Sequence, residues 1–259
     1  MMTAPPTLRA ERISKRYGHV TALDGADLEV RAGEVCALIG DNGAGKSTLV
    51  KILSGAETPD AGTIYLDDNA VTMASPSAAQ DLGVSTVFQD LALASDLGPA
   101  DNFYLGRELL KGRLGRLIGV TDRKRMAATA REEFARLGVN LKSMNVPVGA
   151  LSGGQRQSIA IARAAAWANK VIILDEPTAA LGVVQTDRVL RLVRAVADRG
   201  LAVILVTHNM THVVEVADSV QVLRLGRRVA TFGRGQSTVE KLVAAMTSDT
   251  AAAQEGNEP

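Results

Sequence analysis

The chain contains the stretch Gly40-Asp41-Asn42-Gly43-Ala44-Gly45-Lys46-Ser47-Thr48, which matches the phosphate-binding loop pattern G-x-x-x-x-G-K-[ST]. An apolar run at 35–39 precedes it, and Leu49, Ile52 and Leu53 follow it at helical spacing. The pattern therefore predicts a strand, a glycine-rich loop and a helix, in the order that this kind of loop requires. A glycine-rich turn that matches by chance is the alternative, and the matching flanks argue against it.

The predicted loop offers the groups that bind a nucleotide. Its glycines let successive backbone N–H groups point at phosphate oxygens, and the helix that follows adds the positive end of its dipole. We expect Lys46 to reach the β- and γ-phosphates and Ser47 to offer its hydroxyl to Mg²⁺. The predicted nucleotide-binding residues of the loop are Gly40, Asn42, Gly43, Gly45, Lys46, Ser47 and Thr48.

Composition indicates a large folded core. The chain has 259 residues, of which 46% are hydrophobic and 22% charged, and its net charge is +1. One large domain, or a core with an inserted subdomain, fits this length. The near-neutral charge argues against a surface devoted to nucleic acid. Cys36 is the sole cysteine and lies in an apolar run, so we expect a small buried side chain, no intrachain disulfide and a reducing, cytoplasmic compartment.

The sequence also carries signals about membranes and partners. Runs of eighteen or more uncharged apolar residues are missing, and residues 1–6 lack the apolar core of a signal peptide, so we expect neither a membrane span nor secretion by that route.

The segment 107–131 has eight Lys and Arg residues against Glu108 and Asp122. Because aromatic residues that stack on bases are missing there, a solvated helical face or a docking surface is favoured over nucleic-acid binding.

Polar residues follow three further apolar stretches that predict strands of a mostly parallel sheet. Gln89 follows the first, Asp175 and Glu176 follow the second, and His208 follows the third. Ligands of open α/β sheets bind beyond the carboxyl ends of the strands, so we expect these residues and the phosphate loop to form one site. The predicted strands lie at 83–88, 171–174 and 201–207.

Phosphoryl transfer to water needs charge neutralisation, a placed metal ion and an oriented nucleophile. We expect Asp175 to bind the metal and Glu176 to act as general base toward water. The amide of Gln89 suits contacts with Mg²⁺ and water, and His208 suits the γ-phosphate or the orientation of Glu176. Paired acids at a helix N-terminus, and ordinary polar residues at strand ends, are the structural alternatives.

His208 and His212 have the spacing of two metal ligands on one helix face. A glutamate does not follow His208 as the zinc peptidase pattern demands, so we do not expect a zinc site.

The stretch Leu151-Ser152-Gly153-Gly154-Gln155-Arg156-Gln157 opens another predicted helix, with its body at 159–167. Ser152 and Gln155 fit a capping box, which explains those two residues structurally. Gly153 and Gly154 are costly in a first helical turn and useful where something approaches the backbone closely. The serine hydroxyl, the bare N–H groups and the helix dipole predict an anion half-site without a lysine of its own, suited to a phosphate held by another copy of the loop.

Together and in this order, these motifs resemble the nucleotide-binding subunit of an ATP-binding cassette (ABC) transporter, over about residues 8–246. The Leu-Ser-Gly-Gly-Gln element is the most diagnostic. The resemblance implies that ATP and Mg²⁺ are the cofactors, that ATP is hydrolysed, and that two cassettes pair head to tail around two ATP molecules. The sequence has one phosphate loop and no internal repeat, so we expect the second cassette to come from another chain, most simply a second copy.

The resemblance also implies an organisation for the chain. We expect an α/β P-loop NTPase core with a mostly parallel sheet and an N-terminal antiparallel β subdomain, formed by 1–89 and 151–246. The segment 90–150 would be an inserted helical subdomain, and 247–259 a flexible tail. Tyr17 falls where the family has an aromatic that stacks on adenine, the alternative being a half-exposed residue on an edge strand. Permease subunits would dock near Gln89 and the helical subdomain.

Two short stretches narrow the resemblance. The family has Asp where this chain has Gly182, followed by Val183, so communication between the two sites through that carboxylate is in doubt. The stretch 180–183, together with 88–93, is similar to cassettes of bacterial monosaccharide importers of the ribose, xylose and fructose kind. The implied protein is an ATPase on the cytoplasmic face of the bacterial inner membrane that powers sugar uptake through a separate permease, supplied by a periplasmic sugar-binding protein.

Two other functions are weighed against this one. A soluble cassette ATPase acting on ribosomes or nucleic acid usually carries paired cassettes or long coiled insertions, and this sequence has neither. A regulatory subunit that binds ATP without hydrolysing it would not need the catalytic residues Glu176 and His208. We therefore expect no nucleic-acid partner, and the sequence does not identify the sugar.

Overall fold

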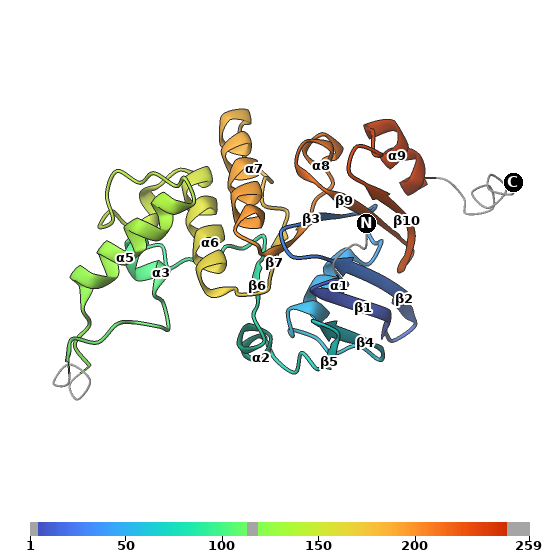
Figure 1. Cartoon of the computed structure of the whole chain (residues 1–259), viewed down its shortest axis with the longest axis horizontal. Helices are drawn as coiled ribbons and strands as arrows, with labels where there is room; N and C mark the ends of the chain where they lie inside the picture. The colour runs from blue at the N-terminus through green and yellow to red at the C-terminus, as the bar shows by residue number, and fades with distance from the viewer. Residues whose placement is uncertain (1–4, 113–118, 248–259) are drawn as a thin grey trace, which may run out of the picture.

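The computed structural model of the chain describes residues 5–112 and 119–247 (Figure 1). Two β-sheets with helices packed against them make up this part of the chain. In chain order the elements are β1 (Leu8–Tyr17), β2 (Val20–Val30), β3 (Val35–Ile39), α1 (Lys46–Leu53), β4 (Ala61–Leu66), β5 (Asn69–Val71), α2 (Pro76–Asp81), β6 (Val84–Val87), α3 (Pro99–Phe103), α5 (Arg123–Arg136), the 3-10 turn η1 (Val148–Ala150), α6 (Gly153–Trp167), β7 (Val171–Asp175), α7 (Val183–Asp198), β8 (Ala202–Val206), α8 (Met210–Val216), β9 (Ser219–Arg224), β10 (Arg227–Gly233) and α9 (Val239–Thr247).

The larger sheet has the strand order β10-β9-β3-β8-β7-β6. Strands β9, β3, β8, β7 and β6 run parallel, and β10 pairs antiparallel with β9. The predicted mostly parallel sheet is thus confirmed, with the three predicted strands present as β6, β7 and β8. The sequence pattern did not indicate the hairpin of β9 and β10, which turns at Leu225 and Gly226 with φ of 46° and 77°.

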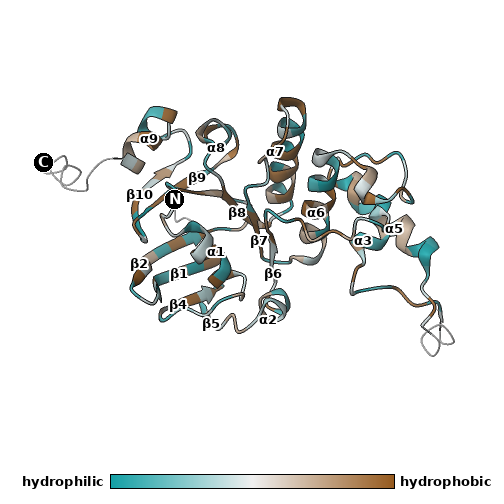
Figure 2. Ribbon diagram, turned by 180° about the vertical axis from the view of Figure 1, so that it is seen from behind, coloured by the Kyte–Doolittle hydropathy of each residue, from teal (hydrophilic) through white to brown (hydrophobic). Residues whose placement is uncertain are grey.

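Alternate residues of the parallel strands face different layers. On β7, Ile172 and Leu174 belong to a core shared with α6 and α7. Val171 and Ile173 belong to the other core, which includes α1 and the smaller sheet. Figure 2 shows these strands as almost continuously hydrophobic, as expected for a parallel sheet that is covered on both faces.

The smaller sheet is antiparallel, with the order β2-β1-β4-β5, and it confirms the predicted β subdomain. Its buried residues Leu8, Ala10 and Ile13 pack with Leu49 and Ile52 of α1. Helix α1 therefore lies in the layer between the two sheets, and its first residue is the lysine of the phosphate loop.

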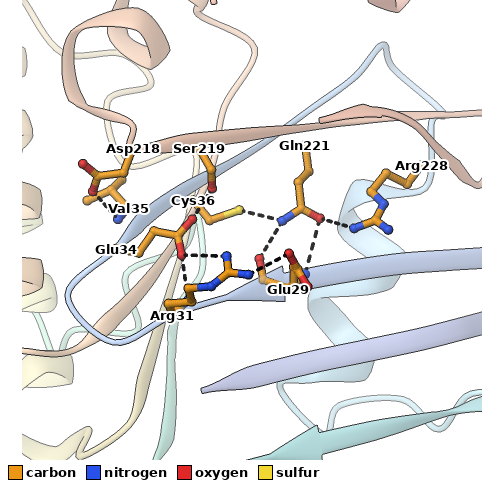
Figure 3. A network of polar contacts seen from close by, with 9 residues as sticks. All are labelled: Glu29, Arg31, Glu34, Val35, Cys36, Asp218, Ser219, Gln221 and Arg228. Carbon is orange, nitrogen blue, oxygen red and sulfur yellow. Dashed lines mark hydrogen bonds and ion pairs between the residues drawn. The ribbon is translucent and has the colours of Figure 1, made fainter. Parts of the chain in front are cut away.

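A polar network joins the two sheets on the side away from α6 (Figure 3). The Gln221 side chain on β9 donates from Nε2 to the Glu29 carbonyl oxygen of β2 at 2.6 Å, and to Cys36 Sγ of β3 at 3.2 Å. Ser219 donates to Glu34 in the same network. Cys36 is fully buried as predicted, and burial raises the pKa of its thiol to about 12.

The segment 90–150 contributes α3, α5 and η1, which pack against α6. Phe103 lies at the centre of an aromatic cluster, with ring centroids 5.4 Å from Phe134 and 5.6 Å from Trp167. This cluster is continuous with the core under α6 and α7, so the domain boundaries at 89/90 and 150/151 stay a prediction. Part of the basic segment, 113–118, lies outside the described residues, and so does the predicted tail from 248 onward, whereas Thr247 ends α9.

Helices α6 and α7 are close-packed at their N-terminal ends because Gly154 has no side chain. A Cβ at Gly154 would lie 2.8 Å from both Cβ and Cγ of Gln185 on α7. The neighbouring Gly153 has more room, since its Cβ would meet only Leu181 Cδ2, at 3.4 Å. Two adjacent glycines of one motif therefore have different steric environments.

We predict that Gly154→Ala lowers the free energy of unfolding by about 1–3 kcal/mol, because the added methyl group overpacks the α6–α7 contact. The matched control Gly153→Ala should be neutral, or stabilising by up to about 1 kcal/mol, because alanine restricts the unfolded chain at a helical position. Urea unfolding with a constant m-value measures both. Equal losses at the two positions would contradict this packing argument.

Candidate functional site

The phosphate-loop residues lie between β3 and α1, as predicted. Gly40, Gly43 and Gly45 have φ of 155°, 83° and 103°, which side-chain-bearing residues rarely adopt. A Cβ at Gly40 would lie 2.1 Å from the Leu223 carbonyl oxygen, and one at Gly45 would lie 2.5 Å from the Ala22 carbonyl oxygen. The loop thus needs glycine both for its backbone conformation and for its contact with the hairpin strands around it.

Lys46 opens α1 and its ammonium group points back onto the loop. Its Nζ donates to the carbonyl oxygens of Gly40 at 2.6 Å and Asp41 at 2.9 Å. Burial lowers the pKa of Lys46, while the carboxylates of Glu176, Asp41 and Asp175 oppose that shift. The N-cap of α1 is Gly45, which has no side chain to bond the free backbone N–H groups of the first turn. A cation and unbonded N–H groups at one helix start make a binding site for an anion such as phosphate.

Two acidic residues lie beside this loop: Asp175 ends β7, and Glu176 follows it. Burial and the nearby Glu176 raise the pKa of Asp175, and Lys46 counteracts that rise. Glu176 has a φ of 50°, a strained conformation for this residue type, and its backbone N–H donates to the Val206 carbonyl oxygen at 2.9 Å. Parallel pairing of β7 with β8 therefore holds the strained residue in place.

The side chain of Glu176 is 17% exposed and its two oxygens differ. Oε1 lies 2.7 Å from Nδ1 of His208, whose own side chain is 72% exposed. Oε2 is buried and has no hydrogen-bond partner among the described residues. An unpartnered buried carboxylate oxygen is costly and is suited to accept a hydrogen bond from a water or substrate group.

Gln89 follows β6, the neighbour of β7, so it lies at the same edge of the sheet, and its side chain is exposed. The backbone after it is held by Arg163 of α6, which donates to the carbonyl oxygens of Leu91 at 3.1 Å and Ala92 at 3.0 Å. Burial lowers the pKa of this guanidinium. The motifs did not predict a role for Arg163, although it is the lone charged residue within the apolar helix body 159–167.

The second histidine of the His-x-x-x-His spacing does not converge with the first on a shared ligand. His212 Nδ1 lies 3.1 Å from Oγ1 of Thr178, two residues after Glu176. Both histidines therefore contact the segment 176–178, through different side chains.

Tyr17 ends β1, which pairs with both β2 and β4. Strand β1 lies between β2 and β4 in the sheet, but its register with β4 ends at Ser14, and Tyr17 is paired with Val20 of β2. The sheet therefore has an open edge at Tyr17. Its ring is 44% exposed. Its hydroxyl bonds Glu57, which raises the pKa of the phenol, and the nearby Thr48 side chain of the phosphate loop opposes that shift. The exposed ring thus stands beside the phosphate loop.

Ser152 caps α6 and forms the predicted capping box with Gln155. The Gln155 N–H donates to Ser152 Oγ at 3.3 Å, and the Ser152 N–H donates to Gln155 Oε1 at 3.0 Å. The close backbone approach expected at Gly154 is made by Gln185 of the same chain, whereas Gly153 stays open. A cavity of about 590 Å³ adjoins this turn, and Arg136, Arg188 and Arg191 are among its lining residues.

The Ser152 turn is separate from the phosphate loop within one chain. Helices α6 and α1 pack on opposite faces of the parallel sheet, with α6 in one core and α1 in the other. Hydrogen bonds and ion pairs among the described residues do not link the two motifs. The structure therefore gathers the phosphate loop, Asp175, Glu176 and His208 at one place, with Gln89 at the same sheet edge, and leaves residues 152–155 apart.

Among the described residues, no helix combines the length and the apolar character needed to cross a bilayer.

Comparison with known proteins agrees with this geometry. The ABC transporter family matches residues 23–179. The fructose import ATP-binding protein of Rhizobium meliloti is 48% identical over 95% of both chains. The xylose/arabinose import ATP-binding protein of Sulfolobus acidocaldarius is 41% identical over 93% of this chain and 94% of its own. A dimeric ATP-binding cassette bound to ADP and Pi, in a post-hydrolysis state, superposes with a TM-score of 0.70 at 25% identity, covering 87% of this chain and 98% of the other. This chain therefore belongs to the ABC transporter family as one of its ATP-binding cassettes.

Proposed function

We propose that this chain is the ATPase subunit of an ABC importer and powers the uptake of a monosaccharide through a separate membrane permease. The observation that carries the ATPase part is the Glu176 carboxylate, fixed by His208 on one oxygen and unpartnered on the other, beside the phosphate loop. The sugar-import names of its relatives support the transport part. None of these findings favours a ribosome or nucleic-acid role.

The nucleotide is ATP, bound through the phosphate-loop residues Gly40, Asn42, Gly43, Gly45, Lys46, Ser47 and Thr48, with the Tyr17 ring stacking on adenine. Lys46 exchanges its two loop carbonyls for phosphate oxygens, a stronger charge-assisted contact. The exposed ring of Tyr17 and the nearby Thr48 side chain support the stacking role.

Mg²⁺ fits the donor set at the sheet edge, which consists of the Ser47 hydroxyl, the Asp175 carboxylate and the Gln89 amide oxygen. Hard divalent cations prefer such oxygen ligands. The raised pKa of Asp175 agrees with this role, because a group destabilised as an anion gains from a nearby cation. When bound, Mg²⁺ neutralises charge on the phosphates.

Glu176 acts as the general base. Its Oε2 accepts a hydrogen bond from the attacking water and takes the proton as the water oxygen bonds the γ-phosphorus. The bond from the γ-phosphorus to the oxygen bridging the β- and γ-phosphates breaks in the same reaction, so ADP leaves and phosphate is formed. His208 holds Oε1 at 2.7 Å, so the carboxylate keeps its orientation. The Gln89 amide would orient the same water, and its place at the same sheet edge supports this role.

Residues 152–155 complete the site of a second copy. Ser152, Gly153, Gly154 and Gln155 form a helix start with an exposed serine, far from the Lys46 of their own chain. A head-to-tail dimer would bring them to the γ-phosphate bound by the partner, and the relative that was solved as a dimer with ADP and Pi supports this arrangement.

Gly182 and the exposed Val183 stand where the family carries a carboxylate, so the two ATP sites of such a dimer would communicate without that carboxylate.

The permease would dock beside Gln89 and the segment 90–150, on the cytoplasmic face of the bacterial inner membrane. Arg163 supports this, because it ties the backbone after Gln89 to α6, the helix that begins at the Ser152 turn. A permease bound there would therefore affect both Gln89 at the sheet edge and the Ser152 turn at the start of α6. A periplasmic sugar-binding protein would take part only through the permease.

Glu176→Gln should lower kcat for ATP by about 100-fold or more, because the amide cannot take a proton from water. Affinity for ATP should remain, and the variant should accumulate as an ATP-bound dimer in size-exclusion chromatography. The matched control Glu132→Gln, an exposed residue of α5, should behave as the wild type. Hydrolysis at the wild-type rate by Glu176→Gln, or full activity from a monomer at every concentration, would contradict the assignment.

Lys46→Ala should weaken nucleotide binding by about 10- to 100-fold, because a charge-assisted contact with phosphate is lost. In cells that lack the native gene, this variant should fail to restore the accumulation of labelled fructose, xylose or ribose, whereas the wild type restores at least one of them. Lys241→Ala, on the surface of α9, is the matched control. Unchanged affinity in a titration would refute the binding role, and a wild type that restores no monosaccharide would refute the transport role.

A further inference from the structure

We propose that His212 is a positioning residue for ATP hydrolysis, acting through Thr178 to hold the segment that carries Glu176. The proposal rests on the function proposed for Glu176. His212 is the second histidine of the His-x-x-x-His spacing, and the mechanism proposed above gives a role only to the first, His208. His208, which precedes α8, bonds Glu176 Oε1 at 2.7 Å, and Nδ1 of His212 in α8 lies 3.1 Å from Thr178 Oγ1. The two histidines therefore hold two ends of a three-residue segment.

The segment 176–178 needs such support. Glu176 is held at a φ of 50°, a conformation that persists only where the surroundings enforce it. His208 restrains the carboxylate from the solvent side, because its own side chain is 72% exposed. Thr178, in contrast, is 8% exposed, and its hydroxyl finds its bonding partner in His212. The buried contact is therefore the stiffer of the two.

His212 is itself well anchored. The Asn209 side chain caps α8 and accepts from the backbone N–H groups of Thr211 at 3.1 Å and His212 at 3.3 Å. Met210 and Val213 of the same helix are buried in a core with Leu242 of α9. A fixed helix thus presents the imidazole to Thr178.

The charge state of His212 suits this contact. Burial lowers its pKa, with His208 acting in the same direction, while Glu215 and Glu176 oppose the shift. A neutral imidazole offers either a donor or an acceptor at Nδ1, and a threonine hydroxyl can be its partner in both tautomers.

The test compares steady-state ATP hydrolysis by His212→Ala and Thr178→Val, the second of which removes the hydroxyl and keeps the side-chain shape. Each should lower kcat by about five- to tenfold, the effect of one hydrogen bond, with KM for ATP unchanged because neither side chain contacts the nucleotide. The double variant should lose no more than either single variant, as expected for two residues that act through one contact. His212→Asn and Thr178→Ser, which retain polar atoms, should recover most of the rate.

Thr211→Val, an exposed neighbour on the same helix, is the control for a change of α8 itself. Thermal unfolding checks that each variant is folded, and if His212→Ala is not, the Thr178→Val and Thr178→Ser pair decides alone. Wild-type kcat in Thr178→Val, losses that multiply in the double variant, or no recovery with Thr178→Ser would overturn the positioning role. If Glu176→Gln also hydrolyses ATP at the wild-type rate, the proposed function itself fails; if that variant is inactive and Thr178→Val is not impaired, only the role of His212 fails.

Discussion

The parallel hydrogen-bonded pairing of β3, β8, β7 and β6 is the constraint on which the rest of the structure depends. It aligns the carboxyl ends of four strands, and each end leads directly into a group of the site: the phosphate loop, His208, the Asp175–Glu176 pair and Gln89. The register is firmly specified, because alternate residues of β7 enter two different cores and a shift by one residue would exchange them. The hydrophobic layers therefore fix the site geometry as firmly as the polar contacts do.

Strain and charge are concentrated at that edge. Glu176 adopts a left-handed backbone conformation and keeps one oxygen buried without a partner, while Lys46 bonds carbonyl groups of its own loop. The backbone conformation and the unpartnered oxygen of Glu176 are unfavourable locally, and Glu176 is held by Val206 through the strand pairing and by His208 through the carboxylate. The loop that holds Lys46 is fixed by its fit against Leu223. Binding of a polyanion with its cation would relieve the unpaired charges, which is the physical sense in which the site is prepared for ATP.

The turn at 152–155 shows how one motif serves two purposes. Its serine and glutamine cap α6, and Gly154 lets α7 approach, so three of the four residues have reasons within the chain. What contacts within the chain do not explain is Gly153, which stays open at a helix start on the opposite side of the sheet from α1. The case for a second copy depends on this residue and on the separation of the two helices, more than on the capping residues of the motif.

The sequence by itself determined the order of strand, loop and helix around Lys46, the parallel sheet, the polar residues at the strand ends and the capping box, because these depend on local periodicity and on short spacings. Only the tertiary structure decided that β1 lies between β2 and β4, that Gly154 is required by Gln185, that Arg163 donates to the backbone at Leu91 and Ala92, and that His212 contacts Thr178. The residues in each of these contacts are far apart along the chain, and which of them meet is set by how helices pack on the sheet, which no local pattern encodes.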